Sequence, residues 1–124
     1  MPRNMNLHFV SSNEFWIYFV YKKRTGNVFN NENRMIMDYI ESSTPKSLEK
    51  QYGKHPTQKP IQVIEYLIKI LSNEEDLVLD PFMGSGTTGK SAIKLNRRFI
   101  GIELNKKYFE IAEKRISSIN PILE

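Results

Sequence analysis

A glycine-rich turn between a short apolar run and an amphipathic stretch constrains this chain more than any other feature. Residues 80–91 read DPFMGSGTTGKS and directly follow the apolar residues 77–79. Gly84, Gly86 and Gly89 have the GxGxxG spacing of dinucleotide-binding folds, in which glycines let the backbone approach a ligand at a helix N-terminus. The turn therefore predicts a strand-to-helix connection that holds a cofactor.

A second pattern overlaps the first. Residues 84–91 (GSGTTGKS) also match the GxxxxGK[ST] loop of nucleoside triphosphatases, in which Lys90 would reach the β and γ phosphates. A triphosphatase needs a second strand that ends in an aspartate to hold magnesium, whereas the next predicted strand ends in Glu103. A glutamate there is suited to accept hydrogen bonds from ribose hydroxyls, which NAD and S-adenosylmethionine both carry.

The residue before the turn separates these two adenosine cofactors. Asp80 ends the first predicted strand, and a carboxylate suits the ammonium and sulfonium groups of S-adenosylmethionine better than it suits a pyrophosphate. The alternative is that Asp80 only caps its own turn, because aspartate readily bonds nearby backbone. Charge thus favours the methyl donor as the ligand.

The second half of the chain predicts alternating helices and strands. Pro60 opens a helix with apolar residues at helical spacing, and the apolar runs 77–79 and 99–102 read as short buried strands. A helix follows each strand, with Thr88, Ser91, Ala92 and Leu95 on one face of the first, and Tyr108, Ile111, Ala112 and Ile116 on one face of the second, which Asn105 begins. This order predicts parallel strands with flanking helices, an α/β fold of the doubly wound type.

The first half is divided differently. Residues 15–21 (FWIYFVY) predict a strand buried on both faces, with Trp16 in the core, so residues 1–24 form a strand region. Residues 25–54 are rich in Asn, Ser and Lys and predict an irregular exposed segment. Residues 55–124 then form the cofactor-binding part of a single domain of 124 residues.

Composition narrows the class of protein. The chain has no cysteine and only two well-separated histidines, so we expect no metal site, and no run approaches the roughly 20 apolar residues of a membrane span. A cytoplasmic location is the default expectation. Residues 1–60 hold nine Lys and Arg against five Asp and Glu, whereas residues 61–124 hold nine of each. A basic first half fits contact with nucleic-acid phosphates, although such an excess also serves solubility.

Three segments, in this order, resemble the amino-directed DNA methyltransferases of restriction–modification systems: KHPTQKP at 54–60, DPFMGSGTT at 80–88 and GIE at 101–103. The order is that of a permuted group of the family, in which the target-base motif lies far upstream. The resemblance implies a partial Rossmann-like, S-adenosylmethionine-dependent methyltransferase fold, and methyl transfer to the exocyclic amine of adenine or cytosine in double-stranded DNA.

The same resemblance implies which residues hold the cofactor. They are Asp80, Phe82, Gly84, Ser85, Gly86, Thr87 and Thr88 around the turn, Glu103, Leu104 and Asn105 after the second strand, and His55, Thr57 and Lys59 before the first helix. Glu103 would hold the ribose, with Leu104 and Asn105 beside the adenine. Lys46, Lys50 and Lys54 lie where the family keeps its recognition segment and are the candidates for DNA phosphate contacts.

One element of the family is missing. Family members accept the target amine and stack the flipped base with an (Asp/Asn/Ser)-Pro-Pro-(Tyr/Phe/Trp) segment, which these 124 residues lack. We therefore expect the catalytic residues to lie elsewhere, the chain to be a fragment that is inactive alone, and a complementary N-terminal fragment to be a partner. The alternatives are a phosphate-loop nucleotide-binding protein and a nucleic-acid-binding fragment without catalysis.

Overall fold

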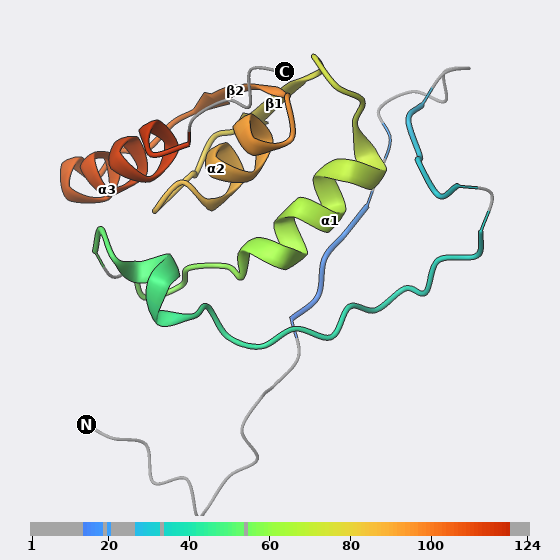
Figure 1. Cartoon of the computed structure of the whole chain (residues 1–124), viewed down its shortest axis with the longest axis horizontal. Coiled ribbons are helices and arrows are strands. Elements are labelled where there is room, and N and C mark those ends of the chain that lie inside the picture. The colour runs from blue at the N-terminus through green and yellow to red at the C-terminus, as the bar shows by residue number, and fades with distance from the viewer. Residues whose placement is uncertain (1–13, 19, 21–26, 33, 54, 120–124) are drawn as a thin grey trace, which may run out of the picture.

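The computed structural model describes residues 14–18, 20, 27–32, 34–53 and 55–119. Its elements, in chain order, are a short 3-10 helix η1 (Ser47–Lys50), α1 (Ile61–Leu71), β1 (Leu77–Asp80), α2 (Thr87–Lys94), β2 (Arg98–Gly101) and α3 (Lys106–Ser117). The predicted order of helix, strand, helix, strand, helix after residue 60 is confirmed. The ribbon in Figure 1 shows α1 crossing the molecule beside the group formed by the strands, α2 and α3.

The strands form a parallel pair. Leu77 is opposite Arg98 and Asp80 is opposite Gly101, so the two strands end at the same edge of the sheet. Strands joined through a helix in this way are expected to be parallel, because the helix returns the chain to the starting edge. The α/β prediction is therefore confirmed for this part of the chain, and the glycine-rich turn lies at the carboxyl edge.

The core lies between one face of the sheet and the helices. Helix α2 contacts both strands, and α1 and α3 both pack against α2. Ile64 and Ile68 of α1 form the buried cluster with Ala92 of α2, and three partly buried residues pack against it: Val78, Leu95 and Phe99. The apolar spacing of the two helices accounts for this burial, since residues three and four apart share a helical face.

Local capping defines two helix ends. The side chain of Asn105 accepts hydrogen bonds from the backbone N–H groups of Lys107 (3.0 Å) and Tyr108 (3.3 Å), which confirms it as the residue that begins α3. At the other end of the sequence, Asn30 donates its side-chain amide to the carbonyls of Lys69 and Ser72, both at 3.0 Å. These two bonds connect the irregular segment around Asn30 to the C-terminal end of α1.

The predicted burial of the two strands is only half right. Their side chains alternate, so that Val78 and Phe99 face the helices whereas Leu77, Leu79 and Ile100 are exposed on the other face. The apolar sequence correctly predicts strands that are suited to burial on both sides. Among the described residues, however, no element covers this second face, and it stays open.

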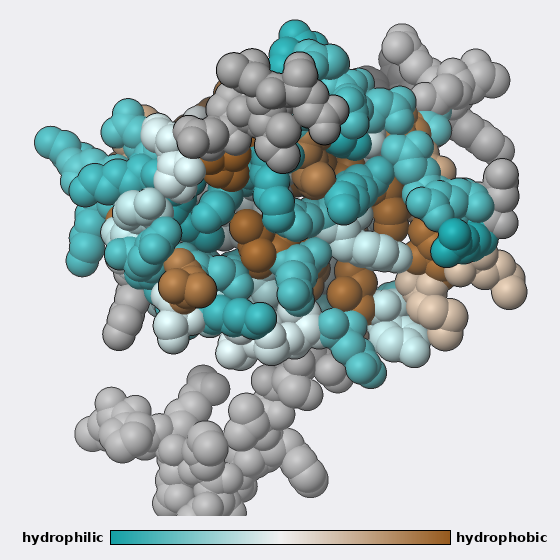
Figure 2. All heavy atoms as spheres, viewed as in Figure 1, coloured by the Kyte–Doolittle hydropathy of each residue, from teal (hydrophilic) through white to brown (hydrophobic). Residues whose placement is uncertain are grey.

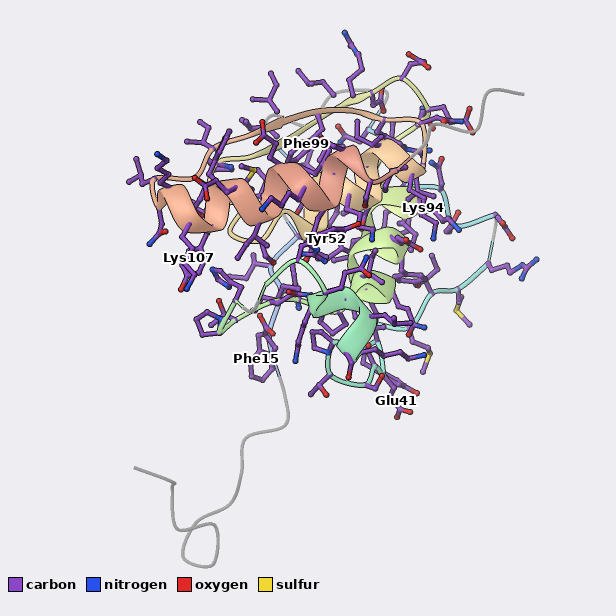
Figure 3. All side chains as sticks on the ribbon, turned by 60° about the vertical axis from the view of Figure 1, so that its left-hand side comes forward. Phe15, Glu41, Tyr52, Lys94, Phe99 and Lys107 are labelled. Carbon is purple, nitrogen blue, oxygen red and sulfur yellow. The ribbon has the colours of Figure 1, made fainter. Side chains whose placement is uncertain are left out.

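The predicted N-terminal buried strand is wrong for the residues that the structure describes. Residues 14–18 and 20 form no strand, and their side chains are exposed, including Phe15, Trp16 and Ile17. Figure 3 shows the Phe15 side chain pointing away from the helices. An apolar run specifies that a strand can be buried, but a strand also needs a neighbour with which to pair, and the described residues supply none here.

Residues 34–46 follow the outside of α1 as a long trace without helix or strand (Figure 1). This segment exposes Met35, Met37 and Tyr39, which adds apolar surface to that of the sheet. In the space-filling view, apolar side chains are scattered between polar ones on the face shown (Figure 2). No described helix is both long enough and apolar enough to cross a membrane.

Candidate cofactor site at the carboxyl edge of the sheet

The glycine-rich loop is held at the carboxyl edge by the carboxylate of Glu103. One oxygen of Glu103 accepts a hydrogen bond from the backbone N–H of Gly84 (3.0 Å), and the other accepts from the backbone N–H of Asn105 (2.8 Å). The side chain that follows β2 therefore joins the loop after β1 to the start of α3. A carboxylate has about four acceptor positions, so further donors can still be accommodated.

Asp80 uses part of its carboxylate locally. One oxygen accepts from the backbone N–H of Phe82 at 3.1 Å, which is the turn-capping role considered as the alternative for this residue. The residue is half-buried, and only one of its oxygens has this bond. The local role and a ligand contact are therefore compatible.

Two large apolar side chains are left open at the same edge. Phe82 follows β1 and is 87% exposed, and Leu104 follows Glu103 and is 98% exposed. Among the described residues, neither side chain has a packing partner that shields it from solvent. Leu104 directly follows Glu103 and Phe82 lies two residues after Asp80, so both offer apolar surface close to a carboxylate at this edge.

The turn depends on glycine for two physical reasons. Gly86 has a φ of +77°, in the left-handed region that favours glycine, and a Cβ added there would lie 2.8 Å from the Cβ of Ala112. At Gly89, an added Cβ would lie 2.5 Å from Phe99 and 2.6 Å from Ile116. The glycines thus allow the loop to approach α3, and α2 to approach β2 and α3.

A buried arginine holds the loop from the side of α3. Arg115 is 1% exposed and donates through one guanidinium nitrogen to the carbonyl of Ser85 (2.7 Å), the hydroxyl of Ser85 (2.8 Å) and the hydroxyl of Thr87 (3.1 Å). Burial lowers the pKa of Arg115 from its ordinary value, and the carboxylate of Glu49 opposes that shift. Sequence analysis did not single out this residue, because an arginine on a helix is usually solvated.

Residues 55–59 are brought to the loop only in part. The ring of His55 lies against Gly84, with its Nε2 3.1 Å from where a Cβ of that residue would be, and packs edge-on against Tyr108 at 4.3 Å between centroids. Thr57 donates its backbone N–H to Nδ1 of His55 at 3.3 Å. Lys59 has different partners, because its ammonium pairs with Glu14 and lies 5.9 Å from the centroid of the Trp16 ring.

The buried side chain of Gln58 connects this segment to the loop. Its Oε1 accepts from the hydroxyl of Ser85 at 3.4 Å, and its Nε2 donates to the carbonyl of Glu49 at 2.9 Å. The carboxylate of Glu49 accepts from the backbone N–H of Lys46 (3.2 Å) and of Ile61 (3.1 Å). A chain of hydrogen bonds therefore runs from η1 to the loop, and sequence analysis missed Gln58 and Glu49.

The candidate DNA-binding lysines lie around η1. Lys46 precedes η1 and is exposed, and Lys50 ends it and is half-buried. Lys54 lies outside the described residues. No group of three or more His, Cys, Asp or Glu side chains that could hold a metal ion occurs within the described part of the chain.

The parallel strands, the helices on one face and the glycine-rich loop at the carboxyl edge together define a Rossmann-like α/β unit. A family model described as DNA methylase (N6_N4_Mtase) matches residues 1–114. The chain belongs to this DNA methylase family. Membership of this family favours a methyl-donor loop over the phosphate loop whose pattern residues 84–91 also match.

Curated relatives and solved structures agree with this family. The Type II methyltransferase M2.DpnII of Streptococcus pneumoniae is 48% identical over 90 residues, which cover 73% of this chain and 34% of the relative. The Type II methyltransferase M2.MboI of Moraxella bovis is 34% identical over 131 aligned positions, covering 99% of this chain and 48% of the relative. The chain thus spans about a third to a half of the length of these relatives.

Among solved structures, the M1.HpyAVI–SAM complex matches with a TM-score of 0.68 and 47% identity, over 76% of this chain and 46% of that one. The cytosine-N4-specific PvuII DNA methyltransferase matches with a TM-score of 0.60 and 28% identity, over 72% of this chain and 34% of that one. The α/β unit described above is therefore part of a Rossmann-like methyltransferase fold.

Proposed function

We propose that this chain is the cofactor-binding part of a DNA methyltransferase, with S-adenosylmethionine bound at the carboxyl edge of β1 and β2. The observation that carries the proposal is the Glu103 carboxylate, which fixes the glycine-rich loop through Gly84 while it stands at the tip of the neighbouring strand. A carboxylate at this position accepts ribose hydroxyls in Rossmann-like folds. The match to a solved methyltransferase–SAM complex supports the same cofactor.

The roles of the remaining residues follow from their places. One carboxylate oxygen of Asp80 accepts from Phe82, and the other, which has no local hydrogen bond among the described residues, faces the ammonium end of the cofactor. The adenine lies near Leu104 and Asn105, and Phe82 covers the ligand with its exposed ring. His55 stands against Gly84 and closes the methionine end, together with Thr57. Lys59 contributes only if it leaves Glu14.

The reaction proposed for the complete enzyme is transfer of the sulfonium methyl group to an exocyclic amine of DNA, N6 of adenine or N4 of cytosine. The amine nitrogen forms a bond to the methyl carbon, the carbon–sulfur bond breaks, and the amine then loses a proton. The residues that accept that amine and stack the flipped base belong to segments other than these 124 residues, where the Pro-Pro-aromatic motif is absent.

The open face of the sheet supports the proposal that further segments complete the fold. Leu77, Leu79 and Ile100 form an exposed apolar row on a pair of strands that the helices cover on one side only. Relatives that are about twice as long have additional chain that could cover it. We propose that a complementary segment, on the same or a second polypeptide, packs here and supplies the target-base residues, and that the assembled enzyme acts in the cytoplasm.

Calorimetry with the 124-residue chain tests the cofactor. We expect S-adenosylmethionine to bind, with NAD and magnesium–ATP as matched ligands that carry an adenosine but differ at the other end. Preferential binding of magnesium–ATP would instead support the phosphate-loop function. In an assay with labelled cofactor and DNA, we expect the chain alone to transfer no methyl groups, and turnover by the purified chain would contradict the assignment of catalysis to other segments.

A further inference from the structure

Arg115 is an unusual residue to find inside a small core. It lies on α3 with its side chain 1% exposed, on the same face as the buried Ile111 and Ala112. Within the described residues, its Nε and second terminal nitrogen are buried without a hydrogen-bond partner. Burying a cation that is incompletely paired is unfavourable, and an apolar side chain of similar length would avoid that cost.

Among the described residues, every acceptor that the Arg115 side chain has belongs to the glycine-rich loop. One terminal nitrogen reaches the carbonyl and the hydroxyl of Ser85 at 2.7 and 2.8 Å, and the hydroxyl of Thr87 at 3.1 Å. These residues stand on either side of Gly86, whose φ of +77° makes the turn. The guanidinium therefore contacts both sides of the turn that places the start of α2.

The chemistry of a guanidinium also fixes the direction of the loop hydroxyls. Arginine donates and cannot accept, so the hydroxyls of Ser85 and Thr87 act as acceptors toward it and must direct their own protons elsewhere. The Ser85 proton goes to Oε1 of Gln58 at 3.4 Å. An apolar residue at position 115 would remove this donor from both hydroxyls, and the Ser85 hydroxyl would keep only its bond to Gln58.

We infer that Arg115 is a positioning residue, which holds the loop around Gly86 and the hydroxyls of Ser85 and Thr87 in the arrangement that receives the cofactor. The expected effect of Arg115 on cofactor binding rests on the proposed function. Its effect on the order of the loop is a property of the unliganded chain. Arg115 touches no cofactor atom in this proposal and acts through the loop.

Amide hydrogen exchange of the complete chain without ligand tests the positioning directly. In Arg115→Met, we expect amide exchange at Gly86 and Lys90 to increase about tenfold or more, because their N–H groups bond to carbonyls of the loop that Arg115 supports. Amides of β1 and β2 should change much less. The matched control is Arg97→Met. Arg97 is also buried, but it bonds to Ser72 and Leu95, at the opposite edge of the sheet.

The control variant should destabilise the chain without a selective change in the loop. Unchanged loop exchange in Arg115→Met, or an equal increase throughout both variants, overturns the inference. If Arg115→Met does not fold, Arg115→Lys decides the question, since lysine keeps the charge but loses the planar array of donors. We then expect selective loop exchange in the lysine variant, and protection equal to that of the original chain overturns the inference.

Cofactor affinity and chemical rescue provide the second readout. We expect Arg115→Ala to bind S-adenosylmethionine about tenfold or more weakly, and methylguanidinium to restore affinity while methylammonium at equal ionic strength does not. Rescue by neither cation, or by both equally, overturns the positioning role. If the original chain binds no S-adenosylmethionine, the proposed function fails, and the exchange experiment still decides the role of Arg115.

Discussion

At the scale of single residues, Glu103 combines two tasks that are separate in many sites. Its carboxylate accepts two backbone N–H groups, from Gly84 and Asn105, and in the proposed function it also accepts the ribose hydroxyls of the cofactor. The shape of the loop and the proposed sugar contact therefore depend on the same two oxygen atoms.

Replacing Glu103 with Gln tests the proposed sugar contact. The amide can still accept from Gly84, but it loses the negative charge that strengthens hydrogen bonds from hydroxyl donors. We expect S-adenosylmethionine affinity to fall about tenfold to a hundredfold by calorimetry. Glu113→Gln, an exposed position on α3, is the matched control and should bind as the original chain does. Equal affinities for the two variants would exclude the ribose role.

Gly86→Ala tests the geometry of the turn. The added methyl meets Ala112 at 2.8 Å, and the backbone must hold a φ of +77° that alanine disfavours. We expect a loss of about 1–3 kcal/mol in the free energy of unfolding, measured by urea denaturation. The same substitution at exposed Lys114 is the control, and a Gly86 variant as stable as that control would contradict the role assigned to the glycine.

The single residues that could be predicted are those whose role follows from spacing along the chain. Gly86 was predicted from the GxGxxG pattern, and Asn105 from the position before a helical face. Arg115 was missed, although it lies three and four residues beyond Ala112 and Ile111 and therefore on their buried face. Helical periodicity marked this position as inward, but the identity of the residue argued for solvent.

At the scale of elements, α3 links the two halves of the candidate site. Its N-cap, Asn105, lies two residues after Glu103, and the helix carries Ala112 and Arg115 against the glycine-rich loop. Figure 3 shows α3 running along the strands, with Lys107 at its first turn. A change at the start of this helix should therefore alter both the free energy of unfolding and the arrangement of the glycine-rich loop.

Asn105→Ala removes the cap of α3. Loss of the two hydrogen bonds to the first turn is expected to reduce the free energy of unfolding by about 1 kcal/mol, measured by thermal or urea denaturation. Asn105→Ser retains a capping oxygen and should stay within a few tenths of a kcal/mol of the original chain. A serine variant as unstable as the alanine variant would show that capping is not what Asn105 contributes.

The segment around η1 gives an element-scale prediction about DNA. In the complete enzyme, replacing Lys46, Lys50 and Lys54 with Ala should reduce the slope of log affinity against log salt by up to about three, one for each lost phosphate contact. Replacing Lys69, Lys94 and Lys114 removes the same charge from other surfaces and should leave the slope nearly unchanged. Equal slopes for the two triple variants would place the DNA elsewhere.

Element order was predictable because segments with apolar residues at helical spacing follow one another with short continuous apolar runs, and turn residues separate them. The extended run 15–21 shows the limit of that reasoning. Its residues are strand formers, yet residues 14–18 and 20 are exposed and unpaired with any described strand. Strand propensity can be read from the residues of one segment, whereas strand formation also requires a neighbouring strand that the segment itself does not specify.

At the scale of the whole molecule, the described residues cover the sheet on one face only, and this arrangement predicts self-association in solution. Leu77, Leu79 and Ile100 present an apolar row, and both strands are edges open to further pairing among the described residues. Exposed edges and apolar faces of this kind promote association. In the proposed function, the segment that would cover this face is also the one that supplies the target-base residues.

We therefore expect the isolated chain to self-associate at micromolar concentrations, as measured by sedimentation velocity. The double variant Leu79→Lys/Ile100→Glu should be more nearly monomeric, because it places charges on the open face. Leu48→Lys, an exposed apolar position in η1, is the control and should associate as the original chain does. A double variant that associates unchanged would show that the open face is not the contact.

Glu103 and Arg115 both hydrogen-bond to the glycine-rich loop, and this matters for any redesign of the site toward a different cofactor. A cofactor analogue without its sugar hydroxyls cannot be accommodated by simply deleting the acidic side chain, because that deletion also frees the Gly84 amide and loosens the loop. To bind such an analogue, a residue of α3 would first have to provide another hydrogen bond to the loop, and only then could Glu103 be replaced.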